Sequence, residues 1–522
     1  MENLSQGKRM LIATALAIVF FFVWGQFFAP QPQQAAASNV SNSNLTITAE
    51  TNNAAPQSLT PMQAPKVNEV ASARSNALTI LKTEEFEATI DELGRISSWI
   101  LLDEKFKAED GEQINLITAS PLPLEVRFTN ANLNQLAFTT AYEAKNSVGS
   151  EGGELVLTQK LGEITLEKRI VFQKNGAYKL SVKALNKDGK PSKEEFFVTT
   201  GHRPNVMADA YAFYGTRIKT SDAKFKDISD GDLSAEESFK GAIFVSNTDR
   251  YYTTLLFNPA GLDVTILPQD KTQIPFVRAV GELEATGFVG AKIFENLKAI
   301  DNELKGVVEY GFFTFIAKYM FSFLSTLFGV FGNWGWAIVA MTIVMRIILF
   351  PLTYRSMVSM GKMKDLAPKM QELREKHKND PAKMQAAIME LYKKTGVNPV
   401  SGCLPILLQI PIFFAVYRVL LNAIELKGAE WIGWYSDLAQ KDPWYLLPIL
   451  MGISMYIQQK MTPTAIQDKT QVMVLRWLPI IFTFFFLWFP AGLTLYWCVN
   501  NICSIAQQYA VNKMLKAKKD KK

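Results

Sequence analysis

The sequence predicts a polytopic α-helical membrane protein into which an all-β sandwich domain is inserted. Apolar residues are concentrated near the start of the 522-residue chain and in the stretch that follows residue 309. The long polar region between them consists of short runs in which apolar and polar residues alternate, as in half-buried strands. The three cysteines, Cys403, Cys498 and Cys503, all lie in apolar segments, so no disulfide framework supports the polar region.

The N-terminus carries Lys8 and Arg9 before an apolar stretch from Met10 to Phe28, which is close to the length of a membrane span. A cleaved signal peptide is the alternative, with "AAAS" at 35–38 as a possible cleavage site. The apolar stretch is longer than the usual signal-peptide core and ends in aromatic residues, so we predict an uncleaved transmembrane anchor over 1–28.

Residues 29–77 consist mainly of Pro, Gln, Asn, Ser, Thr and Ala, a composition that cannot bury enough apolar surface to fold. We predict a flexible tether there. The next runs, which include "RISSWILL", "LAFTTAYEA", "GEITLEKRIVFQ" and "AYKLSVKAL", are separated by turn residues. Closely spaced strands without helices between them predict an antiparallel sandwich over 78–305. Its single histidine, His202, lies in a predicted loop, so we expect a binding or scaffolding module and not an enzyme.

The C-terminal part contains five further predicted spans, and loop charges orient them. The connection from Thr353 to Val400 carries ten basic residues against five acidic ones, which predicts a cytoplasmic location. The next loop is acidic, whereas the following one and the tail at 512–522 are basic. Both termini are therefore expected in the cytoplasm and the sandwich outside it. The five spans are expected at 334–354, 402–421, 444–460, 474–489 and 491–511.

The apolar run at 310–331 is ambiguous because Lys318 interrupts it. A seventh span there would invert all the spans that follow and would contradict the loop charges. We therefore predict that 306–333 forms an amphipathic helix in the outer interface, with Lys318 on its wet side.

One predicted span, in "MTIVMRIILFPL" at 341–352, contains Arg346. Counted from Trp334 at the outer face, Arg346 lies roughly 18 Å deep at about 1.5 Å per residue. An arginine at the centre of a membrane helix costs about 2.5–3.5 kcal/mol on insertion scales. A side chain that reaches back to the inner interface is one interpretation. The other interpretation is that the charge of Arg346 has a function within the membrane. Thr342, one turn earlier on the same face, favours this interpretation.

Other predicted spans contribute polar groups as well. Gln409 lies in "PILLQIPIFF", while Asn500, Ser504, Gln507 and Gln508 share one face of the last span. Such residues often join helices to one another. Together with an arginine they could instead line a hydrated cavity. None of the five spans contains Asp or Glu, so Arg346 is expected to have no carboxylate partner within them.

Four stretches closely resemble the YidC-type membrane protein insertases of Gram-negative bacteria: "MRIILFPLTYRSMVSMGKMKDLAPKMQELREKHKND", "NPVSGCLPILLQIPIFFAVYRVL", "LPILMGISMYIQQKMTP" and "FTFFFLWFPAGLTLYWCVNNICSIAQQ". The resemblance implies a five-helix insertase core over 334–511 that encloses a hydrophilic groove, and a periplasmic β-supersandwich. Family members often have two tyrosines where this chain has Tyr496 and Trp497. The groove residues implied are Arg346, Thr342, Gln409, Trp488, Tyr496, Trp497 and Asn500.

The resemblance also implies the function. A protein of this kind takes nascent membrane proteins from the ribosome into the bacterial inner membrane, alone or with the Sec translocon (SecYEG and SecDF), and assists their folding as a chaperone. Its partners would be those clients, the ribosome, the translocon and membrane lipids, with no DNA. No nucleotide-binding loop occurs, so we expect no cofactor.

The connection at 355–397 is predicted to be a cytoplasmic helical hairpin, because Asp380 and Pro381 form a good helix start and Gly396 a plausible stop. Its methionines could form an adaptable surface for apolar clients, or could pack between the two helices of the hairpin. The lysines of the tail could contact ribosomal RNA or anionic lipid, or could simply follow the positive-inside rule. The methionines are Met357, Met360, Met363, Met370 and Met384.

Two other functions would fit part of this pattern. A transporter could use an intramembrane arginine, but the sequence shows no inverted repeat and no carboxylate for ion coupling in the spans. A passive scaffold for the sandwich would not need Arg346.

Overall fold

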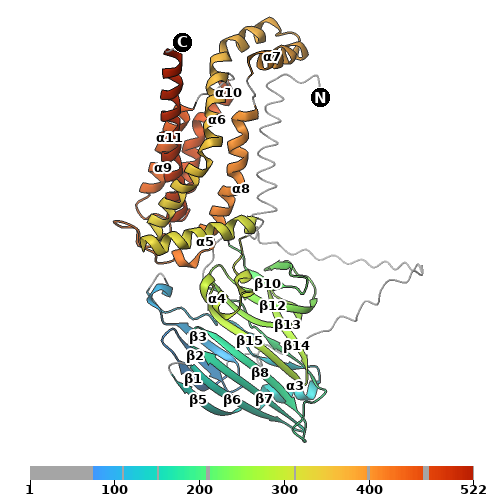
Figure 1. The fold of residues 1–522 in the computed structure, drawn as a ribbon. Coiled ribbons are helices and arrows are strands. Elements are labelled where there is room, and N and C mark those ends of the chain that lie inside the picture. The colour runs from blue at the N-terminus through green and yellow to red at the C-terminus, as the bar shows by residue number, and fades with distance from the viewer. Residues whose placement is uncertain are drawn as a thin grey trace, which may run out of the picture. The chain divides into compact units, whose positions relative to one another are not determined.

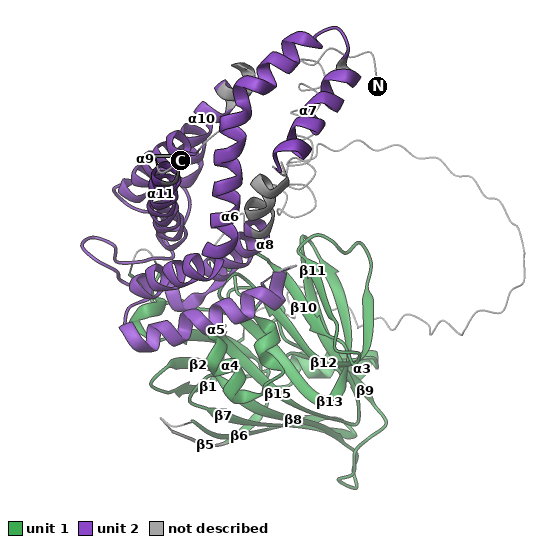
Figure 2. Ribbon diagram, turned by 45° about the horizontal axis from the view of Figure 1, so that its top comes forward, with its two compact units in different colours: residues 1–308 green, residues 309–522 purple. Residues whose placement is uncertain are grey.

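The computed structural model describes residues 75–520, apart from short gaps at 109–110, 150–151, 207–211, 311–312, 397–399 and 463–468. The anchor predicted at 1–28 lies outside the described residues, as does the tether predicted at 29–77 except for its last three residues. The chain divides into two compact units, one ending at Val308 and the other beginning at Glu309 (Figure 2).

The first unit is built from antiparallel strands, which confirms the all-β prediction. A small sheet contains β1 (Ala77–Lys82), β2 (Phe86–Asp91) and β3 (Ile96–Leu101). Two short strands, β4 (Val126–Phe128) and β9 (Glu195–Thr199), pair with each other beside β14 of the large sheet. The large sheet has the order β11 (Phe225–Ser229), β10 (Gly215–Lys219), β12 (Glu237–Thr248), β13 (Tyr252–Gln269), β14 (Thr272–Val280), β15 (Glu282–Ala291), β8 (Ala177–Leu185), β7 (Ile164–Gln173), β6 (Gly152–Leu161) and β5 (Glu143–Gly149).

Helices interrupt the strands, which corrects one prediction. The run "LAFTTAYEA", predicted to be a strand, begins inside helix α3 (Ala131–Thr139) and ends in β5. The Asn130 side chain accepts hydrogen bonds from the backbone N–H groups of Asn132 and Leu133, which starts the helix. Near the end of the unit lie a second helix, α4 (Phe294–Ile300), and a 3-10 turn, η2 (Leu304–Val307).

The second unit is helical, and its helices are labelled in Figure 1. Each of the five ranges predicted as C-terminal spans falls on one of these helices. Within the described residues, only α5 and α6 are long and apolar enough by themselves to cross a membrane. Six membrane crossings therefore remain a prediction. The helices are α5 (Thr314–Phe331), α6 (Trp334–Lys376), α7 (Pro381–Thr395), α8 (Val400–Asn422), α9 (Leu446–Met461), α10 (Lys469–Phe486) and α11 (Ala491–Asp520).

Helix α6 continues without a break from the predicted span into the predicted hairpin, and α7 returns beside its far end (Figure 2). The predicted signals at the ends of α7 are confirmed. The Asp380 carboxylate accepts a hydrogen bond from the backbone N–H of Lys383, and Pro381 occupies the first turn. Gly396 ends the helix in the left-handed conformation, with φ of 63°.

Helix α5 runs crosswise to α6 and α8 in both views (Figures 1 and 2). Near its start, the ring of Phe313 stacks on that of Phe414 of α8 at 6.1 Å. Near its end, the ring of Phe328 stacks on that of Trp334 of α6 at 4.2 Å. These contacts hold α5 against the first residue of α6 and the second half of α8.

The first unit buries a cluster of charged side chains where β2, β3, β4 and β7 meet. Arg95 donates to Asp91 at 2.8 Å and to Glu125 at 3.1 Å, and all three side chains are almost inaccessible to solvent. Arg127 donates to the other oxygen of Glu125 at 2.8 Å. Removing one member of such a buried network strongly destabilises a fold, because the remaining charge loses its partner.

Lys168 of β7 belongs to the same cluster and is fully buried. Its Nζ donates to the backbone oxygens of Gly94 at 2.7 Å and Leu124 at 2.8 Å. Burial lowers the pKa of Lys168 to about 7, although the nearby charge of Asp91 opposes this shift.

We expect the free energy of unfolding of the β unit to increase as the pH is raised from about 7 to about 10. Over this interval the unfolded chain keeps a proton on Lys168, whose ordinary pKa is 10.5, while the folded chain has lost it. Stability rises with pH wherever the unfolded state binds more protons. The dependence of this free energy on pH is measured by urea denaturation of the full chain at several pH values. Cleavage of the β unit by a protease reports how much of it is unfolded at each urea concentration.

The variant Lys168→Met should lose this increase, whereas Lys160→Met, which changes an exposed lysine on β6, should keep it. If the free energy of unfolding rose equally with pH in wild type and in Lys168→Met, the proton responsible would belong to another group.

Candidate functional site

Arg346 lies on α6 and is partly buried, and its hydrogen-bond partner is a neutral side chain of α11. Its Nε donates to Oδ1 of Asn500 at 2.7 Å. In the part of the chain that the structure describes, no carboxylate is paired with Arg346, and its two terminal nitrogens donate to no protein group.

Two further residues of α11 support this contact. Gln507 donates from Nε2 to the backbone oxygen of Arg346 at 3.1 Å, and Ser504 donates to the backbone oxygen of Asn500 at 2.9 Å. The Oε1 atom of Gln507 is buried and accepts no hydrogen bond from the described residues. A polar atom of this kind is costly to bury unless water or a ligand completes its hydrogen bonding. The α6–α11 interface thus combines an unneutralised cation with an unsatisfied acceptor.

Thr342 and Gln409 make contacts of a different kind. Thr342 is almost fully buried, and its hydroxyl donates to the backbone oxygen of Ile338 in its own helix at 2.7 Å. Gln409 of α8 donates from Nε2 to the hydroxyl of Tyr496 at 3.3 Å. Tyr496 is itself buried and lies one turn before Asn500 on α11. The predicted polar residues therefore connect α11 to both α6 and α8.

The two predicted tryptophans lie in different surroundings. Trp497 packs into an aromatic cluster with Phe413 of α8, at 4.7 Å between ring centroids, and Phe486 of α10, at 5.2 Å. Trp488 is 58% exposed and has the edge-on ring of Phe484 at 4.7 Å. Among the described residues, its contacts are with Phe484 and Phe485 and not with the groups around Arg346.

Sequence reasoning missed a second polar contact, made by the residue after Asn500. Asn501 is buried and donates from Nδ2 to Oγ of Ser454 on α9 at 3.2 Å. Successive residues of a helix point about 100° apart, so the two asparagines face different helices. The paired amides in "CVNNICSIAQQ" were the available signal for this arrangement.

The methionines of the hairpin divide into two groups. Met370 is buried, and its sulfur accepts a hydrogen bond from the hydroxyl of Tyr392 on α7 at 3.4 Å. It therefore packs between the two helices of the hairpin. Met357 is also buried. A more accessible set remains: Met360, Met363 and Met384 are partly buried, and Met389, which was not singled out from the sequence, is 56% exposed.

A loop that precedes α9 is organised around Asp442, whose side chain is 1% exposed. Its carboxylate accepts hydrogen bonds from the backbone N–H groups of Trp444 at 3.0 Å and Leu447 at 2.7 Å, and from the hydroxyl of Tyr435 at 3.2 Å. The backbone N–H of Ala491, at the start of α11, donates to a carbonyl of the same loop. Asp442 thus fixes the loop and the first turn of α9 at this end of the bundle.

Charged and amide side chains that meet between long apolar helices are typical of membrane proteins in which a polar group acts within the membrane. The fold and the site together define such a protein, with an all-β domain attached to a helical membrane unit.

Comparison with known proteins identifies the family. The family model described as "60Kd inner membrane protein" matches residues 326–519, and that of the "YidC periplasmic domain" matches residues 79–323. The membrane protein insertase YidC of Campylobacter jejuni is 46% identical over 100% of this chain and 98% of its own length. That of Wolinella succinogenes is 46% identical over 99% of this chain and 97% of its own length.

A solved structure, described as an active YidC insertase with the first transmembrane domain resolved, is 20% identical with a TM-score of 0.38, covering 84% of this chain and 93% of its own. On its sequence relatives, the chain belongs to the YidC family of membrane protein insertases, which is not a family of enzymes. This confirms the resemblance found in the sequence and the presence of a periplasmic domain.

We expect Asp442→Leu to loosen the loop at 424–445. Four N–H or O–H donors would lose a charged acceptor, and each hydrogen bond to a charged group contributes about 1.5–3 kcal/mol. Limited proteolysis of the purified full chain should therefore cut this loop faster. Glu430→Leu alters an exposed carboxylate of the same loop and is the matched control. Equal cleavage rates in the two variants would contradict the role given to Asp442.

Proposed function

We propose that this chain inserts nascent membrane proteins into the inner membrane by giving their polar segments a hydrated path beside Arg346. The observation that carries the proposal is the pairing of Arg346 with the neutral Asn500, without a carboxylate partner among the described residues. Membership in a family whose relatives are named membrane protein insertases supports the same function.

The physical argument starts from the charge. Asn500 satisfies one donor of Arg346 but cannot neutralise its positive charge, so the countercharge must come from water, lipid or a client. Two unit charges at 4 Å attract by about 4 kcal/mol at an effective dielectric constant of about 20. An acidic residue in a client segment would therefore be drawn toward Arg346. Water held there would also keep polar client groups partly hydrated, because unsatisfied polar groups are costly in lipid.

Short helices would reduce the distance that a client must cross. Helix α9 has 16 residues, a length of about 24 Å at about 1.5 Å per residue. The hydrocarbon core of a bilayer is about 30 Å thick, so a span of this length favours local thinning. The client's apolar segment would then leave sideways into lipid, driven by the hydrophobic effect. The groove formed in this way would be lined by Arg346, Thr342, Gln409, Tyr496 and Asn500, with Trp497 and Trp488 contacting the apolar part.

The topology proposed for this function has six spans, with both termini in the cytoplasm. Helix α5 is long and apolar enough to cross a membrane by itself. Its crosswise direction and its contacts with the first residue of α6 and the second half of α8 support an interfacial position instead.

The hairpin and the basic tail are the parts that we assign to cytoplasmic partners. Met360, Met363, Met384 and Met389 would offer an adaptable apolar surface to client segments. The lysines near the end of α11 would bind ribosomal RNA or anionic lipids. Action with the Sec translocon and assistance in client folding complete the proposed role.

We expect Arg346→Ala to lower insertion of a client with an acidic translocated tail by about tenfold, which corresponds to about 1.4 kcal/mol. Arg346→Lys should retain much of the activity because the charge remains. The measurement is protease protection of the client tail in vesicles that contain the purified protein. A client with a neutral tail is the control and should be affected less. Insertion of both clients at the wild-type level by Arg346→Ala would favour a passive scaffold, and ion flux in the same vesicles would favour a transporter.

We also expect a stalled, ribosome-bound nascent chain with one apolar segment to crosslink to a photoreactive residue at Gln409. The same probe at Ile347, which follows Arg346 on α6 and is 65% exposed, tests for contact with any accessible surface. A probe at Trp488 tests whether the client also reaches the outer end of α10. Crosslinks at Ile347 but not at Gln409 would place the client outside the proposed path.

A further inference from the structure

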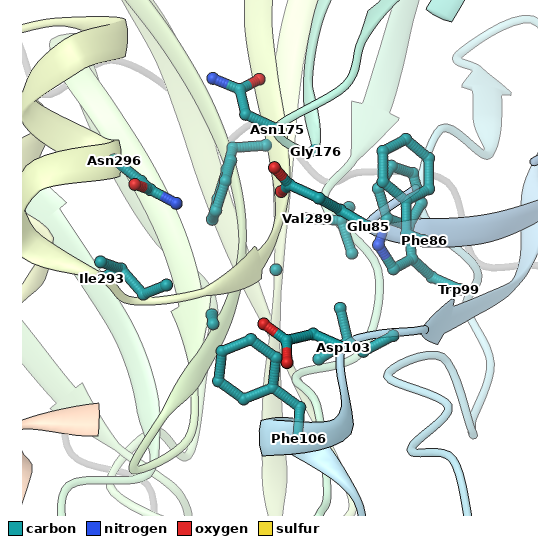
Figure 3. A pocket seen from close by; sticks show the side chains of 14 residues that line it. Glu85, Phe86, Trp99, Asp103, Phe106, Asn175, Gly176, Val289, Ile293 and Asn296 are labelled. Atoms are coloured by element: carbon teal, nitrogen blue, oxygen red, sulfur yellow. The ribbon is translucent and has the colours of Figure 1, made fainter. Parts of the chain in front are cut away.

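The first unit contains a cavity of about 180 Å³ between its small and large sheets, with Glu85 and Asn296 among its lining residues (Figure 3). The rings of Phe86 and Trp99 form one wall, where they stack at 4.1 Å with 14° between their planes. Both rings are almost inaccessible to solvent, so they support the packing of the two sheets. A charged group that is partly accessible lies instead in the second unit, on α8.

This group is Arg418, a second arginine inside a helix that was predicted to span the membrane. It lies in the apolar run "VYRVLL", four residues before α8 ends at Asn422, or about 6 Å along the axis at about 1.5 Å per residue. The topology proposed above makes this the outer end of α8. Lysine and arginine are enriched on the cytoplasmic side of spans, so a positive charge at the outer end calls for a partner there.

The guanidinium of Arg418 has no protein partner among the described residues. It makes no hydrogen bond, ion pair or ring contact with them, and the side chain is half-buried. The next carboxylate along the chain, Glu425 in the short turn η4 (Ile424–Leu426), forms no ion pair with it. A partly buried charge without a counter-ion is costly, so water, lipid or another molecule must supply one.

Neighbouring contacts place Arg418 on the face of α8 that meets the start of α5. Phe414 lies one turn before it on the same face, and its ring stacks on that of Phe313 at 6.1 Å. Asn422 lies one turn after it and donates from Nδ2 to the backbone oxygen of Glu309 at 2.9 Å. Both contacts are made with the segment that leads into α5.

This face points away from the site around Arg346. Gln409, whose side chain donates to α11, precedes Arg418 by about two and a half helical turns, so the two side chains leave α8 on opposite sides. The residues below Arg418 on its own side, Pro411 and Phe414, are apolar and half-buried. The charge of Arg418 is thus turned toward lipid and α5, and not toward the path proposed for clients.

The arrangement favours a phosphate that carries apolar chains. A guanidinium only donates hydrogen bonds, and it can bind a phosphate through two parallel N–H···O bonds. Phospholipid phosphates lie in the interfacial layer, which is also where the end of a span lies. The apolar side chains below the charge suit the acyl chains of such a lipid. Soluble phosphate offers the charge without the chains and would use only part of this surface.

We propose that Arg418 binds the phosphate of a phospholipid in the outer leaflet, and that an acyl chain of this lipid packs along Pro411 and Phe414. The bound lipid neutralises the charge of Arg418 and holds the end of α8 beside the start of α5. A net anionic lipid binds more tightly, because the ammonium of a zwitterionic headgroup offsets part of the phosphate charge. The site depends on the topology proposed above, but not on the role of Arg346.

The test is photocrosslinking of the full chain in nanodiscs that contain a phosphatidylglycerol with a diazirine near the start of one acyl chain. Mass spectrometry of the digested chain maps the crosslinks, which we expect within residues 410–422 of wild type. Arg418→Gln should lower their yield by about five- to tenfold, the effect of one basic residue at a lipid surface. Arg418→Lys keeps the charge and should keep most of the yield.

Two controls separate the charge from other causes. Arg355→Gln removes an exposed arginine from α6, at the cytoplasmic end in the proposed topology, and should leave the crosslinks on α8 unchanged. A diacylglycerol with the same diazirine lacks the phosphate and should react with α8 much less. Equal yields in wild type and Arg418→Gln, equal yields from both lipids, or equal losses in Arg418→Lys and Arg418→Gln would overturn the proposal.

Labelling of intact spheroplasts with a membrane-impermeant maleimide tests the topology separately. Glu430 is exposed in the loop that follows α8, so Glu430→Cys should be labelled from outside. Wild type, whose cysteines lie in apolar segments, gives the background. Labelling of Glu430→Cys together with crosslinks that do not depend on Arg418 would overturn the lipid site alone. No labelling would overturn the topology, and the outer-leaflet site with it.

Discussion

A positive charge held inside an apolar helix without a carboxylate partner is the constraint on which the second unit depends. A carboxylate beside Arg346 would lower the cost of burying it, but the pair would then be closed to a client. The structure provides Asn500 instead, which orients the guanidinium and leaves its charge uncompensated within the described residues. In the function proposed above, this uncompensated charge would be available to a client or to water, at the cost of bundle stability.

Helix α11 meets this constraint by contacting three other helices through polar groups. Asn500 and Gln507 bond to α6, Asn501 bonds to α9, and Tyr496 accepts a bond from α8. These contacts lie within about three turns of one helix, so a change at one of them also shifts the others. Effects of double substitutions around Arg346 should therefore not add, since the residues share partners. The same polar contacts of α11 therefore hold Arg346 in place and set the positions of α6, α8 and α9.

Sequence patterns predicted the features that depend on how a residue differs from its neighbours along the chain. Arg346 stands out because its neighbours are apolar, and the antiparallel β unit follows from short alternating runs. Features that depend on distant partners were not predicted. Lys168 occupies an inward position of a strand, and only the fold brings two carbonyls and a charged cluster to it. Alternation also misled at 136–139, which lie in a helix that the capping Asn130 starts. Trp488, assigned by resemblance, is 58% exposed and has its ring contact with Phe484.

The continuity of α6 connects the intramembrane charge to the hairpin. One helix of 43 residues carries Arg346 and then the arm that packs against α7. Pro351 interrupts this connection just over one turn after Arg346, because proline removes one backbone hydrogen bond of the helix. Helices bend most readily at such positions. Since α11 fixes α6 on the Arg346 side of this proline through Asn500 and Gln507, a bend at Pro351 would let the arm move while the charge stayed in place.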